Sequence, residues 1–179
     1  MYEFMIKNTI IITGEKGEGK TTKLLSIVDM LKSYNLKVEG FVALGSWQNN
    51  ERSSYKLVDV SSGNSIIICT IDNIDGYSKH GKFYFNPVAV EAGEDILLKN
   101  FTKKTVVVID EVGPFELNNK VWHKILTHQL QNTHNILVLS VRKKLVSQVI
   151  NKYKLLNAKV YGISEPNDVI IKEIIDHVI

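Results

Sequence analysis

Cysteine is nearly absent from this chain of 179 residues, because Cys69 is the single one. A lone thiol cannot form an intramolecular disulfide or supply a four-cysteine zinc site, so both are excluded. The isoleucines that flank Cys69 predict a buried structural thiol. The five histidines have none of the spacings typical of metal ligands, which indicates surface or helix-face positions for His80, His123, His128, His134 and His177.

Long apolar runs and a strong charge of one sign are also missing. No apolar stretch reaches the roughly 18 residues that a membrane-spanning helix needs, and residues 1–7 are too short and too mixed for a signal peptide. The net charge is only +3, and the short pairs Lys103-Lys104 and Lys143-Lys144 are typical of solvated faces rather than of a nucleic-acid groove. These absences predict a cytoplasmic protein with no membrane contact and no strong nucleic-acid signal.

Only three prolines interrupt the chain, and it has no repeats or low-complexity segments. Hydrophobic residues make up 44% of it and charged residues 23%, which is ordinary globular composition. A chain of this length most simply forms one domain over residues 1–179, large enough to bury most of its apolar surface.

What the chain does contain is a phosphate-binding loop pattern. Residues 14–21 read Gly-Glu-Lys-Gly-Glu-Gly-Lys-Thr and match G-x-x-x-x-G-K-[ST] at every position. The apolar segment Thr9–Thr13 precedes the loop, and leucine, isoleucine and valine recur at helical spacing after it. A strand, a glycine loop and a helix in this order surround an anionic phosphate with backbone N–H groups. The pattern therefore predicts a site for nucleoside triphosphates.

Each residue type in this loop has a predicted task. The glycines let the backbone approach phosphate oxygens without a Cβ in the way. Lys20 brings a positive charge to the β- and γ-phosphates, and Thr21 can bind Mg²⁺ through its hydroxyl. Glu15 and Glu18 are expected to point outward and to present only their N–H groups. The nucleotide-binding residues predicted in this segment are Gly14, Glu15, Lys16, Gly17, Glu18, Gly19, Lys20, Thr21 and Thr22.

Strands and helices alternate along the rest of the chain, which implies right-handed crossovers and a parallel sheet. We expect an α/β fold of three layers, the P-loop NTPase fold, with a mainly parallel five-stranded sheet, helices on both faces and one antiparallel hairpin beside it. Residues 46–54 are expected to form an exposed connection. The further strands are predicted at Leu36–Leu44, Thr105–Ile109, Asn135–Val141 and Ala158–Ile163, the hairpin at Tyr55–Val60 and Ser65–Thr70, and the later helices at Asn86–Asn100, Val121–Gln131, Leu145–Lys154 and after Pro166.

Asp110 and Glu111 follow the β-branched run Thr105–Ile109, which is typical of a strand covered on both faces. Ligands of parallel sheets bind at the carboxyl ends of the strands, so this acidic pair is expected on the same edge as the glycine loop. An acid there can hold Mg²⁺, which assigns the metal to Thr21 and Asp110. Glu111 is placed to orient and deprotonate an attacking water.

Arginine is scarce as well, with only Arg52 and Arg142 in the chain. Hydrolysis of a triphosphate commonly uses an arginine at the γ-phosphate. Arg142 follows the predicted strand Asn135–Val141 at its carboxyl end and is the favoured candidate, while Arg52 lies in the polar connection. The predicted catalytic residues are therefore Lys20, Glu111 and Arg142.

Taken in order, these motifs resemble a known family. The glycine loop, Gly40-Phe41 and the segment Val108-Ile109-Asp110-Glu111-Val112-Gly113-Pro114-Phe115-Glu116-Leu117 follow one another as in the small P-loop nucleoside-triphosphatases of thermophilic prokaryotes, a family that includes the vertebrate cancer-related nucleoside triphosphatase. The family carries an Asp-Glu-Ile-Gly element followed shortly by Glu-Leu. After Gly40-Phe41 it usually has a Glu/Arg-rich stretch, whereas this chain has no arginine before Arg52.

The resemblance implies a RecA-like core and slow, Mg²⁺-dependent hydrolysis of nucleoside triphosphates to diphosphates and phosphate with loose base preference. It also implies that a second segment touches the nucleotide, namely Val107, Val108, Ile109, Asp110, Glu111, Val112, Gly113 and Pro114.

Two other functions remain open from the residues alone. Small P-loop proteins often transfer the γ-phosphate to a nucleoside monophosphate, although such kinases usually use several arginines to clamp two charged substrates. The second alternative function is a binding module that signals to a partner when nucleotide is bound. Such a module would not need Glu111.

Overall fold

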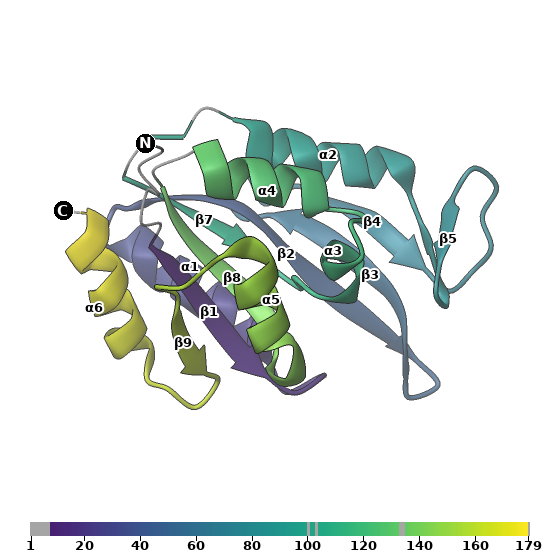
Figure 1. Ribbon diagram of the computed structural model, residues 1–179. Helices are drawn as coiled ribbons and strands as arrows, with labels where there is room; N and C mark the ends of the chain where they lie inside the picture. Colours follow the sequence, from purple (N-terminus) through teal and green to yellow (C-terminus); the bar gives the residue numbers. More distant parts are fainter. Residues whose placement is uncertain (1–7, 100, 103, 133–134, 179) are drawn as a thin grey trace.

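The computed structural model of the chain describes residues 8–99, 101–102, 104–132 and 135–178. A mixed sheet of nine strands lies between two layers of helices, in the strand order β5-β6-β4-β3-β2-β7-β8-β1-β9 (Figure 1). The strands are β1 (Thr9–Gly14), β2 (Lys37–Gln48), β3 (Glu51–Asp59), β4 (Ser65–Thr70), β5 (Ser78–His80), β6 (Phe83–Phe85), β7 (Thr105–Ile109), β8 (Ile136–Arg142) and β9 (Lys159–Gly162). The helices are α1 (Lys20–Ser33), α2 (Pro87–Leu98), α3 (Pro114–Leu117), α4 (His123–Asn132), α5 (Val146–Tyr153) and α6 (Asn167–Val178), with a 3₁₀ turn at Lys143–Leu145.

Five neighbouring strands, β2, β7, β8, β1 and β9, pair in parallel. This arrangement confirms the expected parallel core. Because the strands run in one direction, their carboxyl ends meet at one edge of the sheet, as the arrowheads in Figure 1 show. The loop after β1 and the acidic pair after β7 are therefore brought to the same edge.

The pleat of β7 divides the interior into two cores. Val106 and Val108 pack with the buried side chains of α1 and α6, whereas Val107 and Ile109 pack with those of α2 and α4. All four side chains are completely buried. A β-branched run without polar alternation fits this position, because both faces of the strand lie in a core.

The antiparallel part of the sheet is larger than predicted. Strands β3, β4, β6 and β5 extend it beyond β2, each antiparallel to its neighbour. The expected exposed connection at residues 46–54 was wrong, since β2 runs to Gln48 and β3 begins at Glu51. Asn49 and Asn50 both have positive φ, which is the signature of a tight hairpin turn. This ribbon is largely exposed, so its sequence has no hydrophobic alternation to reveal it.

Helix boundaries largely follow the local signals. The Asn86 side chain accepts a hydrogen bond from the Val88 N–H at 3.1 Å, which confirms Asn86 as the cap of α2 with Pro87 in the first turn. This helix ends at Leu98, and the predicted last residue, Asn100, lies outside the described residues. Trp122 is buried as expected but lies just before α4. No described helix is both long and apolar enough to cross a bilayer.

Gly40 allows β2 to lie close against β7. Its φ is +104°, and a Cβ there would lie 2.0 Å from the Val108 carbonyl oxygen. Only glycine fits such an approach without displacing a backbone. The close pairing continues to Phe41 and Ile109, directly before Asp110.

Candidate active site

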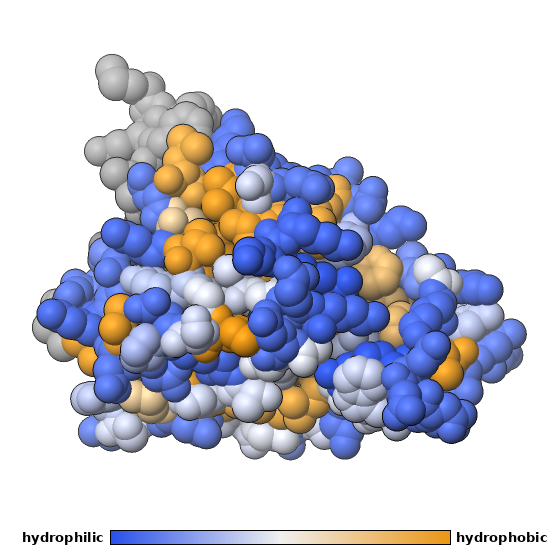
Figure 2. Space-filling view, turned by 90° about the horizontal axis from the view of Figure 1, so that it is seen from below, coloured by the Kyte–Doolittle hydropathy of each residue, from blue (hydrophilic) through white to orange (hydrophobic). Residues whose placement is uncertain are grey.

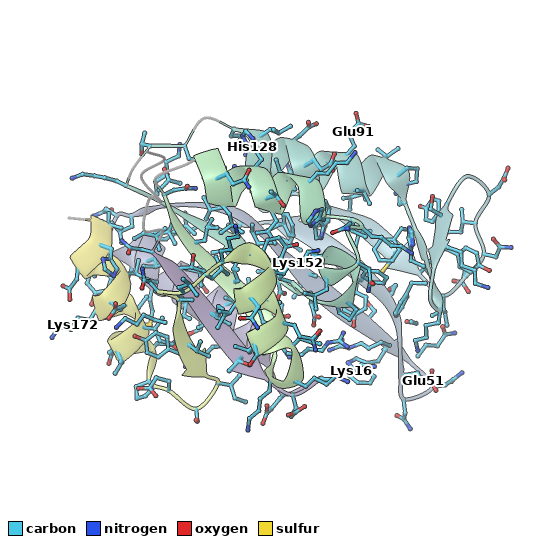
Figure 3. All side chains as sticks on the ribbon, viewed as in Figure 1. Lys16, Glu51, Glu91, His128, Lys152 and Lys172 are labelled. Atoms are coloured by element: carbon cyan, nitrogen blue, oxygen red, sulfur yellow. The ribbon has the colours of Figure 1, made fainter. Side chains whose placement is uncertain are left out.

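The glycine loop joins β1 to α1 at the carboxyl edge of the sheet. Gly17 and Gly19 have φ of +80° and +101°, a region that favours glycine, and Gly19 caps α1. Figure 3 labels Lys16 in this loop, and Lys16 lines a cavity together with Tyr55 of β3. The face seen from below in Figure 2 is largely hydrophilic, with hydrophobic residues gathered in patches.

The Lys20 side chain folds back onto the start of the loop. Its side chain is buried, and its Nζ donates to the carbonyl oxygens of Gly14 at 3.2 Å and Glu15 at 2.7 Å. Two carbonyl oxygens of the loop thus hold the ammonium in place.

Glu18 does not point outward as predicted. Its Oε2 accepts a hydrogen bond from the Glu15 N–H at 2.5 Å, so the carboxylate folds back over the loop. The reason is electrostatic, because a loop of N–H groups at a helix N-terminus attracts the nearest anion. Glu18 therefore occupies a donor that a phosphate oxygen would use.

Asp110 connects this loop to β7. The Thr21 hydroxyl and the Ala43 N–H donate to its Oδ2 at 2.7 and 3.0 Å. The Glu111 N–H donates to its Oδ1 at 3.0 Å, and the Ser140 hydroxyl donates to the same oxygen. Burial raises the pKa of the Asp110 carboxyl, and the Ser140 hydrogen bond opposes that rise. The structure thus places Asp110 in contact with Thr21, directly after the glycine loop.

The oxygen atoms of Thr21 and Asp110 are the hard ligands that Mg²⁺ prefers. Mg²⁺ is usually held by one or two carboxylates, with phosphate oxygens and water completing its coordination. In the described part of the chain, no three His, Cys, Asp or Glu side chains come together as a metal cluster. The donor set thus fits an ion that arrives with a phosphate ligand.

Glu111 has a strained backbone next to this carboxylate. Its φ is +60°, which is uncommon for a residue with a Cβ and costs on the order of 1 kcal/mol. Two hydrogen bonds hold the conformation, since its N–H also donates to the Ser140 hydroxyl at 2.8 Å. Strain of this kind often occurs where function requires a fixed side-chain direction. The Glu111 side chain is about 31% exposed and can reach solvent.

Arg142 ends β8 beside Glu111, and its Nη2 lies 3.4 Å from the Glu111 Oε2. Its Nε is buried and has no hydrogen-bond partner among the described residues. Arg52, in contrast, donates to the Gly45 carbonyl and stacks 4.2 Å over the Trp47 ring. Of the two arginines, Arg142 lies next to the acidic pair, and its side chain is 26% exposed.

The remaining predicted residues occupy different surroundings. Val107, Val108 and Ile109 are completely buried in β7, and Val112 is 1% exposed. These side chains therefore position the acidic pair and do not face the loop. Pro114 lines a cavity that adjoins Asp110 and Glu111.

Two polar residues near the site were missed from the sequence. Ser140 is completely buried in β8 and bonds to both members of the acidic pair. The sequence signal that could have revealed Ser140 is a single polar residue inside the otherwise apolar run of β8. Glu116 is the other: its carboxylate accepts from the Gly113 N–H at 2.9 Å and from the Trp122 N–H at 3.5 Å.

Glu116 predicts a pH dependence of stability. Burial raises the pKa of its carboxyl from 4.5 to about 7. The folded state therefore holds a proton that the unfolded state releases between these values, so the free energy of unfolding falls by about 3 kcal/mol as the pH rises through this range. Above pH 7 the contribution of Glu116 to the free energy of unfolding no longer changes with pH. Urea unfolding at pH 5 and pH 8 should show this fall for the wild type and a smaller one for E116Q, and an equal fall in both would contradict it.

The chain is similar to known proteins over most of its length. The family described as NTPase matches residues 9–175. A nucleoside-triphosphatase THEP1 of Saccharolobus solfataricus is 29% identical over 95% of this chain and 92% of its own length. The protein of the same name from Archaeoglobus fulgidus is 30% identical over 88% of this chain and 90% of its own length.

Two solved structures have the same fold. The solution structure of a human cancer-related nucleoside triphosphatase matches with a TM-score of 0.69 at 21% identity, covering 94% of this chain and 96% of that one. The crystal structure of THEP1 from Aquifex aeolicus matches with a TM-score of 0.67 at 23% identity, covering 93% and 96%. These matches confirm the expected α/β fold.

Proposed function

The chain belongs to the NTPase family, and we propose that it hydrolyses nucleoside triphosphates, including ATP and GTP, to the diphosphate and phosphate with Mg²⁺. The observation that carries this proposal is the 2.7 Å hydrogen bond from the Thr21 hydroxyl to Asp110. It joins the phosphate-binding loop to the acidic end of β7, the two halves that a metal-bound triphosphate needs.

Binding rests on the polyphosphate. The N–H groups of the loop and the N-terminus of α1 receive the phosphate oxygens, and Lys20 adds a positive charge. Thr21 and Asp110 would hold Mg²⁺, which when bound neutralises and orients the β- and γ-phosphates. All nucleoside triphosphates share these groups, which supports a broad base preference.

Hydrolysis follows from the residues around the γ-phosphate. Glu111 takes a proton from water as the water oxygen bonds to the γ-phosphorus. The bond from this phosphorus to the β–γ bridging oxygen breaks, and the nucleoside diphosphate leaves. Arg142, whose guanidinium lies beside Glu111, donates to the γ-phosphate oxygens as their charge redistributes.

Glu18 is expected to weaken nucleotide binding. Glu18→Ala frees the Glu15 N–H and removes a competing anion, so the dissociation constant of a non-hydrolysable ATP analogue should fall about tenfold. Calorimetric titration measures it. Glu15→Ala is the matched control, because it removes the same charge without freeing an amide. Equal effects of both substitutions would show that only the net charge matters.

Arg142 is expected to assist turnover. Arg142→Ala should lower the rate of phosphate release about a hundredfold by removing donors to the γ-phosphate. Arg52→Ala removes the same charge from a residue already held by Gly45 and Trp47, and its rate should stay within about twofold. A rate of Arg142→Ala equal to the wild type would exclude this arginine from the mechanism.

The proposal is tested by following products. The purified chain is incubated with Mg²⁺ and each nucleoside triphosphate, with and without a nucleoside monophosphate, while phosphate and nucleotides are quantified. We expect equal amounts of phosphate and diphosphate without any acceptor. Transfer that requires the monophosphate would identify a kinase, and tight binding without products would identify a binding module.

A further inference from the structure

A cavity of about 320 Å³ adjoins the proposed active site on the side of the antiparallel strands. Asp110, Glu111 and Arg142 line it where β7 and β8 end. Its remaining wall comes mainly from β2, β3, β4, β6 and the segment around α3. Six of its lining side chains are aromatic: Phe41, Tyr55, Phe83, Phe85, Phe115 and Trp122.

The nucleotide itself does not explain this cavity. Under the proposed function, the triphosphate would lie along the loop after β1 with its γ-phosphate near Asp110 at the end of β7, which stands two places away in the sheet order. The cavity continues beyond β7, past β2 toward β3 and β4. Phosphate groups would lose their hydration against apolar walls at a high cost. Hydrolysis by water needs no aromatic pocket.

The chemistry of the walls indicates what the cavity can hold. Its volume lies at the lower end of the range for small-molecule sites. Aromatic walls favour a flat ring through offset or edge-to-face contacts. Leu57, Ile68 and the thiol of Cys69 add further apolar lining. Burial raises the pKa of Cys69 to about 12, so this thiol stays uncharged. The charged lining side chains are balanced in number, with Lys16, Lys82 and Arg142 against Asp110, Glu111 and Glu116. They give the cavity no excess of formal charge that would favour an anion such as a nucleoside monophosphate.

We propose that this cavity binds a second small molecule, an uncharged compound built on one or two rings, beside the γ-phosphate of the nucleoside triphosphate. A polar group on the compound would meet Glu111 and Arg142 at the active-site end. Since the compound then occupies the space from which water attacks, it slows hydrolysis without lowering nucleotide affinity. This second part rests on the proposed function, whereas binding of the compound does not.

The probe for binding is naphthalen-2-ylmethanol, studied by saturation-transfer NMR with the full chain. We expect a signal without nucleotide and an undiminished signal with Mg²⁺ and a non-hydrolysable ATP analogue. Displacement by the analogue would overturn the proposal, because the cavity would then hold the base of the nucleotide. The absence of a signal in both conditions would also overturn it.

Filling the cavity with a larger side chain tests whether the probe binds there. Cys69→Phe adds a ring to the lining and should weaken probe binding at least tenfold, and Leu57→Phe does the same from β3. Ile67→Phe is the matched control, because Ile67 lies on the same strand as Cys69 but is 48% exposed and should leave probe binding unchanged. If either filled variant fails to bind the ATP analogue, the other is used. Unchanged probe binding in a filled variant that binds the analogue overturns the location.

The effect on turnover is measured separately. Saturating probe should lower phosphate release by the wild type at least fivefold and leave the dissociation constant of the analogue unchanged. Cys69→Phe should hydrolyse normally and lose its response to the probe. Probe binding without any effect on a measurable turnover would contradict the position beside the γ-phosphate. If the wild type shows no turnover at all, the proposed function fails, and the NMR results still decide whether the cavity binds the probe.

Discussion

Replacing Lys20 by alanine is expected to lower phosphate release by at least three orders of magnitude and to weaken binding of a non-hydrolysable ATP analogue about a hundredfold. The Lys20 Nζ is held over the loop by the carbonyl oxygens of Gly14 and Glu15. It therefore supplies a preorganised charge in a partly enclosed site, where such a charge contributes far more than in water. Phosphate release and calorimetric titration measure the two effects.

Lys37→Ala is the control for this experiment. Lys37 begins β2 at the opposite edge of the sheet, and its side chain is 54% exposed beside Glu39. Glu39 keeps Lys99 as a second partner at 3.3 Å, so this variant should match the wild type in both measurements. Turnover of Lys20→Ala within tenfold of the wild type would mean that the loop does not bind the triphosphate.

Replacing Glu111 by glutamine is expected to lower the rate of phosphate release by about two to four orders of magnitude and to change nucleotide affinity by less than about threefold. Glutamine keeps the shape of the side chain and the backbone bond to Ser140 but cannot accept the proton of water. The lost contact with Arg142 is 3.4 Å long and partly exposed, so its loss should affect stability little.

Glu91→Gln is the matched control, because Glu91 lies on the solvent side of α2, far from the loop in Figure 3. Its rate should equal that of the wild type. A normal rate in Glu111→Gln would remove the general base from the mechanism and favour the binding-module alternative. Lost binding in the same variant would instead indicate a structural role for Glu111.

The parallel core was predictable because its signals are local. The loop pattern fixes its own strand and helix, and buried parallel strands have β-branched runs such as Thr105–Ile109 that stand out in a sequence. The antiparallel extension was underestimated for the opposite reason. Strands β5 and β6 have three residues each, too few for a periodic pattern, and residues 46–54 of the β2–β3 ribbon contain one hydrophobic residue, Trp47, which gives no alternation. The Asn49-Asn50 turn was its one readable signal.

The site was predictable where chain order determines position. Sheet topology alone places Thr21 and Asp110 at one edge, and the structure brings them into hydrogen-bond contact. Ser140 and Glu116 depend on contacts between distant segments, which a single sequence does not reveal. The direction of the Glu18 side chain also escaped prediction, because it is decided by competition for one amide of the loop.

The claim on which the proposed function depends is that a metal–nucleotide complex is held between the Thr21 hydroxyl and the Asp110 carboxylate. Electron paramagnetic resonance of Mn²⁺, used in place of Mg²⁺ with a non-hydrolysable ATP analogue, tests this directly. We predict one bound ion per chain in the presence of the analogue, and at least tenfold weaker metal binding in Asp110→Asn and Thr21→Ala. Metal binding that is unchanged in both variants would contradict the claim.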